Sequence, residues 1–201
     1  MSGRVLARAP HPASSDGRVR RAQRSGQAIV EALLDLVGRG DVDPTAQQVA
    51  ARARVGIRTV FRRFSDMESL FTEMDARITT NALPHLLAGT PTGTPRQRAL
   101  ALVRRRIAFF ERIAPYKRAG NIKRAHSPFL RQRHAQLVRL LRSELHRSLP
   151  EATTAPVADA VELATSFEAW DRLRSEQRLS RRRAQAVVEH TVLALLAPLR
   201  R

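Results

Sequence analysis

Apolar residues recur every three or four positions along most of the chain, which is the spacing of an α-helix that buries one face. In the first half, this pattern predicts four helices, over about 24–39, 45–53, 57–64 and 66–83. In the second half, apolar stripes predict further helices, with stripes beginning at Leu100, Leu130, Val157 and Ala184. Because no segment shows the alternation of a strand, the sequence indicates an all-α protein of about nine helices.

Capping and turn residues indicate where these helices begin and end. Gly38 ends the first helix, and Pro84 is expected to close the fourth. Ser65 or Asp66 can cap the start of the fourth helix, and Ser180 can cap the start of the last. The helix before Ser180 is expected to run without a break from 157 to 177.

The pattern also predicts which side chains face inward. In the segment 57–64, the expected inward residues are Val60, Phe61 and Phe64. In the last helix, they are Ala184, Val187, Thr191, Val192 and Leu195. Both sets follow from the helical spacing of apolar residues.

These signals divide the chain into four parts. Residues 1–23 lack apolar periodicity and carry several arginines, so we expect a disordered basic arm. Residues 24–65 form a three-helix unit, and residues 66–88 form a connecting helix that is expected to be the only link to the rest. A linker rich in Gly, Thr and Pro then leads into a larger helical domain, and residues 89–201 belong to it.

Two short predicted helices are joined by only three residues, Arg54 to Gly56, which is the arrangement of a helix-turn-helix. In the second helix, Arg58 and Arg62 are four residues apart, as are Thr59 and Arg63, so both pairs can face outward. Arginine can bond guanine through two hydrogen bonds, and threonine can contact a base or a thymine methyl group. The alternative interpretation is an ordinary solvated helix face.

The chain is strongly basic, with 36 Lys and Arg against 18 Asp and Glu and a net charge of +18. This charge favours nucleic acid as a partner, although a genome that encodes Arg and Ala freely would produce the same bias. Thirteen of the basic residues lie within 104–147, against only Glu111 and Glu144. That surplus is explained either by a solvated basic surface or by contact with an acidic effector or a second polyanion.

Several classes of protein are excluded or disfavoured. The chain has no Cys, so disulfides and cysteine-ligated zinc are impossible. No apolar run approaches the ~20 residues that span a bilayer. We find no nucleophile motif, no phosphate-binding glycine loop and no metal-ligand spacing among the six His residues. We therefore expect a cytoplasmic protein that is not an enzyme, needs no cofactor and does not bind a membrane.

Residues 27–74 resemble the DNA-binding domain of the TetR family of transcriptional regulators. The resemblance depends on four stretches and their spacing: Ala-Ile-Val-Glu-Ala-Leu-Leu from Ala28, Thr-Ala-Gln-Gln-Val-Ala-Ala from Thr45, Val-Gly-Ile-Arg-Thr-Val-Phe-Arg-Arg-Phe from Val55, and Ser-Asp-Met-Glu-Ser-Leu from Ser65. The stretch from Ser166 to Arg174, followed by Leu179 and Ser180, resembles the junction before the last helix of such regulators.

The resemblance implies a set of DNA contacts. Together with the outward-facing Arg62, the implied DNA-binding residues are Thr45, Gln47, Ile57, Arg58, Thr59, Phe61 and Arg63. Phe61 stands where the family commonly has Tyr, Arg63 where it has His, and Met67 where it has Lys, so the set of phosphate contacts differs. Arg54 stands where Gly is common in the turn; a left-handed conformation there would cost about 1–2 kcal/mol. Gly56 replaces the usual Ser and remains an acceptable cap.

For the second half, the resemblance implies a homodimer formed by the helices near 157–177 and 180–197, and a small-molecule site among residues 100–170. The candidate ligand-binding residues are Phe109, Phe110, Ile113, Tyr116, Phe129, His134 and Trp170. The alternative for each is ordinary core packing. The arginine surplus slightly favours an anionic or amphipathic effector.

The expected function is therefore a regulator of transcription that binds double-stranded DNA. We expect a repressor that releases a palindromic operator when the effector binds. The alternative is a basic helical protein that binds nucleic acid or another partner without reading sequence.

Overall fold

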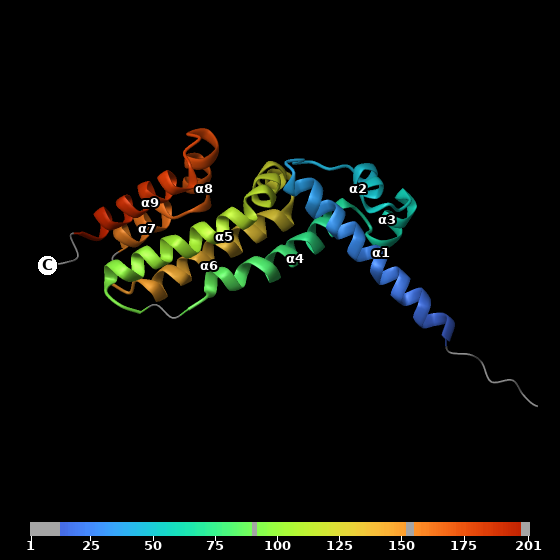
Figure 1. Cartoon of the computed structure of the whole chain (residues 1–201), viewed down its shortest axis with the longest axis horizontal. Helices are drawn as coiled ribbons and strands as arrows, with labels where there is room; N and C mark the ends of the chain where they lie inside the picture. Colours follow the sequence, from blue (N-terminus) through green and yellow to red (C-terminus); the bar gives the residue numbers. More distant parts are fainter. Residues whose placement is uncertain (1–12, 90–91, 152–154, 198–201) are drawn as a thin grey trace, which may run out of the picture. The chain divides into compact units, whose positions relative to one another are not determined.

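The computed structural model describes residues 13–89, 92–151 and 155–197, and all regular structure within these ranges is helical (Figure 1). The prediction of an all-α fold is confirmed. The chain divides into two compact units: an N-terminal unit made of the residues up to Leu36 and of Asp43–Met74, and a C-terminal unit made of Val37–Val42 and the residues from Asp75 onward. No helix in the described part of the chain is long and apolar enough to cross a membrane.

The N-terminal unit contains most of α1 (Ala13–Gly38), then α2 (Ala46–Ala53), α3 (Ile57–Arg63) and the first turns of α4 (Met67–Leu87). Its core is a set of buried aliphatic side chains that includes Ile29, Leu33, Val49, Val60 and Leu70. Each helix contributes to this set, because each carries apolar residues at helical spacing on one face.

The start of α1 differs from the sequence prediction. The helix begins at Ala13, so the expectation of a disordered arm is wrong for residues 13–23, while residues 1–12 lie outside the described residues. The physical reason is propagation: once the buried part of α1 has formed, each added residue costs little, and Ala, Arg and Gln are good helix formers. A lack of apolar periodicity therefore indicates an exposed segment, but it does not exclude a helix.

The end of α4 also differs. Pro84 lies inside this helix, which continues to Leu87, so the expected end at residue 83 is wrong. Proline removes one backbone donor from a helix, but the fully buried Leu86 packs in the core of the C-terminal unit and holds the last turn in place.

The connection between the two units is not α4 alone. The end of α1 and the turn after it, Val37–Val42, belong to the C-terminal unit, so the expectation that a single helix links the two parts is wrong.

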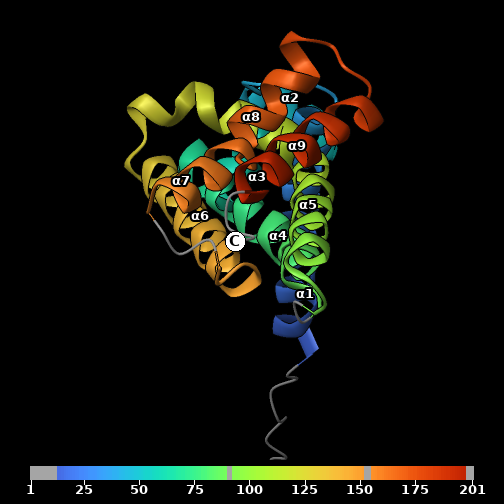
Figure 2. The same cartoon turned by 90° about the vertical axis from the view of Figure 1, so that its left-hand side faces the viewer.

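The C-terminal unit is built around α5 (Pro95–Lys123), which packs against α6 (Pro128–Ser148), α8 (Phe167–Asp171) and α9 (Arg181–Leu196). A short 3₁₀ helix (Arg124–His126) joins α5 to α6. Between α6 and α9 lies α7 (Ala155–Ala164), which contacts both (Figure 2). In the core of this unit, the Phe110 ring contacts the rings of Phe109 and Phe167.

The helix expected over 157–177 is broken. It divides into α7, α8 and a π-helical turn over Arg172–Glu176, with the break at Thr165 and Ser166. The Thr165 hydroxyl donates a hydrogen bond of 2.7 Å to the Val161 carbonyl oxygen, and the Ser166 hydroxyl oxygen accepts one of 3.1 Å from the Ala169 amide. The Thr165 hydroxyl thus bonds to the end of α7, and the Ser166 hydroxyl bonds to the start of α8. Such bonds between a side chain and the backbone compete with a continuous helix.

The buried face of α9 is rotated relative to the prediction. Ala184, Val188 and Val192 are buried, whereas Val187 and Thr191 are exposed. Each predicted inward residue that fails lies one position before a buried one, so the true stripe is 184, 188, 192 and 196. The Ser180 cap is confirmed, because its hydroxyl oxygen accepts a hydrogen bond from the Arg183 amide.

Candidate nucleic-acid interface

The third helix has one anchored face and one exposed face. On the inner side, Val60 is only 1% exposed and Phe64 is partly buried. On the outer side, Arg58, Arg62 and Arg63 are exposed, and they are accompanied by Ile57 and the half-buried Thr59. The helix therefore presents a basic surface on a rigid support, which is what a helix in the major groove requires.

The prediction that Phe61 is buried is wrong, because its side chain is 48% exposed. Val60 and Phe64 lie four positions apart and define the inner face of α3. Phe61 follows Val60 directly and so projects from a different side of α3. Its exposure leaves the ring accessible to a binding partner.

The turn between α2 and α3 is a tight one with a left-handed residue. Arg54 has φ of 55° and ψ of 43°. The Val55 amide donates a hydrogen bond to the Ala50 carbonyl oxygen over 3.0 Å, and the Arg54 amide donates one to that of Ala51 over 3.2 Å. These bonds satisfy carbonyls at the end of α2. Arg54 thus has the left-handed conformation for which the sequence analysis gave a cost, although it carries a side chain.

The start of α2 places Thr45 and Gln47 on the exposed surface. Thr45 forms a capping box with Gln48: its hydroxyl oxygen accepts from the Gln48 amide at 3.2 Å, and its own amide donates to the Gln48 side chain at 2.7 Å. Thr45 therefore fixes the first turn of α2.

Helix α3 contains no acidic residue that could neutralise its arginines. Arg58, Arg62 and Arg63 are its only charged residues, and none is acidic. Arg52 of α2, by contrast, bonds Asp35 of α1 over 2.6 Å, and this hydrogen bond raises the pKa of the Arg52 guanidinium. Arg52 thus ties α2 to α1, which distinguishes it from the three arginines of α3.

After α3, Asp66 starts the fourth helix. Its carboxylate accepts a hydrogen bond of 2.7 Å from the Ser69 amide, and that bond lowers the pKa of Asp66. The prediction that Ser65 or Asp66 caps this helix is confirmed, with Asp66 in the role. The cap fixes the point at which the chain leaves α3.

In the C-terminal unit, four of the candidate ligand-binding residues lie in the buried core. These residues are Phe109, Phe110, Ile113 and Trp170. The Trp170 indole N–H donates a hydrogen bond of 3.0 Å to the Glu111 carboxylate, so its polar atom already has a protein partner. Tyr116 and Phe129 are half-buried.

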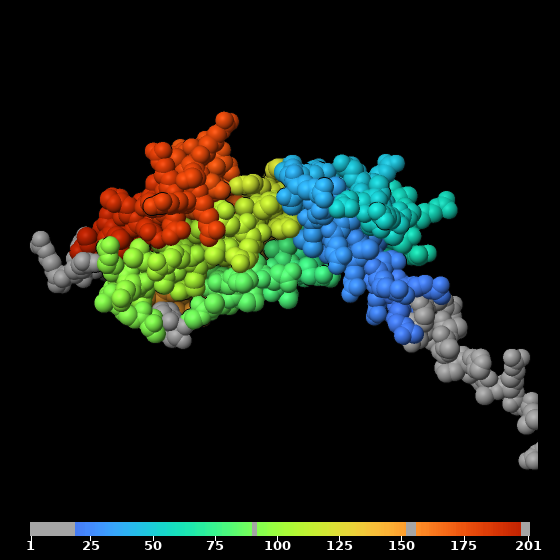
Figure 3. Space-filling model, in the orientation of Figure 1, coloured from blue at the N-terminus to red at the C-terminus, as the bar shows by residue number. Residues whose placement is uncertain are grey.

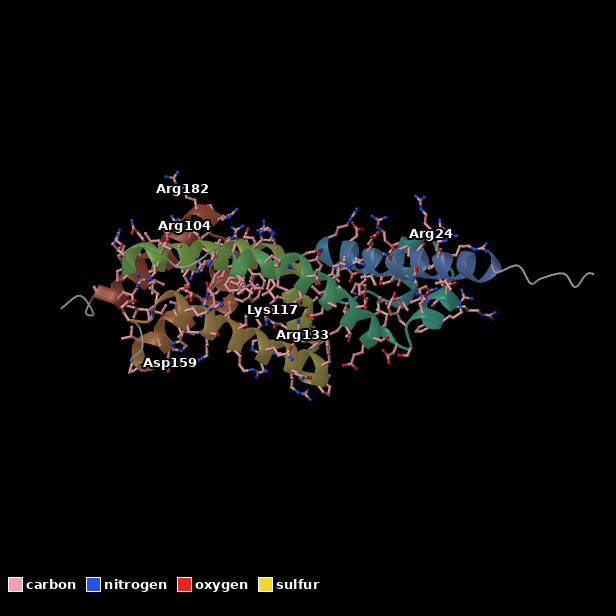
Figure 4. All side chains as sticks on the ribbon, turned by 90° about the horizontal axis from the view of Figure 1, so that it is seen from below. Arg24, Arg104, Lys117, Arg133, Asp159 and Arg182 are labelled. Atoms are coloured by element: carbon pink, nitrogen blue, oxygen red, sulfur yellow. The ribbon has the colours of Figure 1, made fainter. Side chains whose placement is uncertain are left out.

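The remaining candidate, His134, contacts Lys117, which is not among the residues predicted from the sequence. The Lys117 ammonium lies 2.8 Å from His134 Nδ1 and 2.9 Å from the Asn121 side-chain oxygen. Because a lysine ammonium can only donate, Nδ1 must be the unprotonated ring nitrogen. Figure 4 shows Lys117 on the side of α5 that faces α6. Its position four residues after Ile113, on the same helix face, was the signal that could have identified it.

Burial governs the protonation of this pair. Burial lowers the pKa of Lys117, with partial compensation by the Glu168 carboxylate 3.7 Å away. Burial also lowers the pKa of His134, and the positive charges of Lys117 and Arg124 lower it further. The site therefore joins one lysine ammonium to an imidazole that accepts from it and to the Glu168 carboxylate. Its ammonium is the group that could bind a carboxylate or phosphate.

A buried ion pair explains part of the basic surplus. Arg106 and Glu144 are both fully buried and their side chains lie 3.0 Å apart, while Arg105 contacts the same carboxylate over 2.8 Å. The Arg106 guanidinium also donates to the Thr165 hydroxyl over 2.6 Å. Burial lowers the pKa of Arg106, and Glu144 opposes that effect. The burial of Arg106 could have been predicted from its position three residues after Val103, within an apolar stripe.

Other arginines of the surplus also have acidic partners. Arg118 pairs with Asp171 over 2.6 Å, Arg133 with Asp75 over 2.6 Å, and Arg142 with Asp159 over 2.9 Å. The segment 104–147 is therefore less positive locally than its composition suggests. Within the described ranges, no group of three His, Asp or Glu side chains is placed to hold a metal ion.

Comparison with known proteins supports the fold. No protein-family model and no curated protein matches the chain. Among solved structures, a transcriptional regulator from Rhodococcus sp. RHA1 is similar with a TM-score of 0.66 at 18% sequence identity, over 88% of this chain and 96% of that one. A TetR-like transcriptional regulator from the same organism is similar with a TM-score of 0.57 at 18% identity, over 94% and 99%. The chain therefore has the fold of the TetR-like transcriptional regulators.

Proposed function

We propose that the protein is a DNA-binding transcriptional regulator that reads its operator with α3. The observation that carries this proposal is the outer face of α3, where three arginines and no acid stand on a helix whose inner face is anchored by Val60. The similarity in fold to two transcriptional regulators supports it.

In this proposal the DNA contacts divide into two kinds. Arg58 and Thr59, near the start of α3, contact base edges in the major groove, with Ile57 and Gln47 beside them. Phe61, Arg62, Arg63 and Thr45 contact the phosphate backbone, which sets the register but carries no sequence information.

The protein would act as a two-fold dimer. Leu163 on α7 is 69% exposed and Val187 on α9 is 41% exposed, although both are large aliphatic side chains. Figure 3 shows the segment containing α8 and α9 as one continuous surface of the C-terminal unit. Burying these side chains against a second copy would remove apolar surface from water. A two-fold dimer would require a palindromic operator.

The C-terminal unit would bind the effector. Lys117 contacts His134 and lies over the ring of Phe167 in the aromatic core. This combination favours a molecule with an apolar body and an acidic group. A repressor would release the operator if this molecule binds one arrangement of the units more tightly than the other. The α4 helix begins in one unit and ends in the other, so it is one route for that coupling.

The decisive experiment is selection of genomic DNA fragments with the full chain, followed by competition against bulk duplex. A regulator of this kind is expected to prefer one palindrome by at least ~10³-fold. Comparable affinity for all duplexes would instead support the alternative of a basic helical protein without sequence readout.

A further inference from the structure

The middle of α1 contains a buried glycine, Gly26, that lies against the side chain of Arg63. Gly26 is buried, and a Cβ atom placed on it would lie 3.2 Å from Nη2, 3.4 Å from Nε and 3.7 Å from Cζ of Arg63. All three nearest atoms belong to the Arg63 guanidinium. The guanidinium therefore lies so close to the backbone of α1 that an added Cβ atom would require it to shift by a few tenths of an ångström.

A glycine inside a helix needs a reason, because alanine at the same place makes a helix more stable. No positive φ requires glycine here, since residue 26 is helical. The neighbouring Ser25 hydroxyl donates a hydrogen bond of 3.0 Å to the Arg21 carbonyl oxygen, one turn earlier in the same helix. The close approach of Arg63 is the feature that the glycine permits.

Arg63 is the last residue of α3 and one of the three arginines on the proposed DNA-binding helix. Gly26 can hold the guanidinium by contact but takes none of its hydrogen bonds, because the backbone groups of Gly26 are used within α1. Contact with Gly26 therefore uses none of the N–H donors of the exposed Arg63.

We propose that Gly26 is a positioning residue for DNA binding: it provides a seat that holds the Arg63 guanidinium ready for a phosphate oxygen. The inference rests on the proposed function. An arginine that is ordered before binding loses less conformational freedom when it contacts DNA. The seat joins the first helix to the recognition helix through a contact that depends on the absence of a side chain.

The test compares Gly26→Ala, Gly26→Leu and Arg63→Ala in the full chain, on the selected operator duplex. Alanine must displace the guanidinium by a few tenths of an ångström, and leucine occupies the seat. We expect Gly26→Leu to weaken operator binding by about 3- to 10-fold, as for one side chain that must now be ordered on binding. Gly26→Ala should weaken binding less, yet raise the melting temperature by roughly 2–4 °C.

Gly26→Ala is thus expected to make the protein more stable and its operator binding weaker. A residue with a merely structural role would not change these two quantities in opposite directions. Gly120→Ala is the matched control, because Gly120 is also helical and an added Cβ meets only Leu130 at an ordinary 3.8 Å. It should raise the melting temperature and leave binding unchanged. In the Arg63→Ala background, Gly26→Leu should have no further effect on affinity.

The inference is overturned if Gly26→Leu binds the operator like the wild type, or if its effect persists without Arg63. Failure of the proposed function has a different result: the wild type itself would then show no preferred duplex.

Discussion

At the scale of single residues, Arg54 shows how a local conformation can oppose its own side chain. Its left-handed backbone is one that glycine adopts without strain. We expect Arg54→Gly to raise the free energy of unfolding by about 1 kcal/mol in urea denaturation. Arg54→Ala keeps the Cβ atom and should give no such gain. An equal gain from alanine would show that the charge, and not the backbone, is unfavourable there.

Arg58 is the residue on which sequence reading should depend most. Arg58→Ala is expected to lose about 1–3 kcal/mol of operator binding and to relax the preference at one base pair in each half-site. Binding to a panel of single-base operator variants measures both effects. Arg139→Ala removes an exposed charge on α6 and serves as the control. Uniform weakening on every duplex would assign Arg58 to the phosphate backbone.

His134 makes the stability of the protein depend on pH. Its pKa is lowered in the folded state, so the folded protein binds fewer protons than the unfolded chain below the ordinary histidine value of about 6.5. This contribution is complete above that value and is lost as the pH falls. We expect the free energy of unfolding to decrease from about pH 7 to 5, with a smaller slope in His134→Gln. An identical slope in the two proteins would contradict the assignment.

At the scale of helices, the Arg106 and Glu144 pair joins α5 to α6 and reaches the break between α7 and α8. Glu144→Leu should cost about 3–5 kcal/mol of stability, because it leaves a buried guanidinium without its counter-charge. The double variant Arg106→Met with Glu144→Leu should recover most of that loss. Chemical denaturation measures both, and a double variant as unstable as the single one would show that packing, not charge, is lost.

Helix ends that depend on a nearby side chain could be predicted from the sequence. Asp66 and Ser180 were both identified, because each cap needs only its own residue and an amide three positions later. Ends that depend on distant packing could not be predicted. Pro84 remains inside α4 because Leu86 is buried by residues far along the chain.

The same distinction applies to the candidate site. The place and the outward arginines of α3 followed from local spacing, whereas the exposure of Phe61 and of Val187 depends on the rotation of each helix about its axis. A pattern of apolar residues fixes that rotation only to within about one residue, or 100°. Local spacing could have placed Lys117 on the helix face of Ile113, but its contact with His134 joins two helices and so could not be predicted from the sequence.

At the scale of the whole molecule, the proposed dimer is the main prediction. Leu163→Glu combined with Val187→Glu should give a monomer at micromolar concentration in sedimentation and should weaken operator binding, because both charges would be buried at the interface. The monomer should still unfold cooperatively, since both positions are exposed within one chain, but at a lower melting temperature than the dimer, because association stabilises the folded state. Ile122→Glu, an exposed position on α5, is the control and should remain dimeric. A wild-type protein that sediments as a monomer would refute the dimer.

The division of the chain has a practical consequence for engineering. Because Val37–Val42 belongs to the C-terminal unit while the residues on both sides of it belong to the N-terminal unit, the chain passes between the units three times. No single cut can therefore release either unit whole. A fragment that ends at Met74 would expose Val37, and one that begins at Asp75 would lack it. A chimera that combines the N-terminal unit of one regulator with the C-terminal unit of another must take residues 37–42 from the parent of the C-terminal unit.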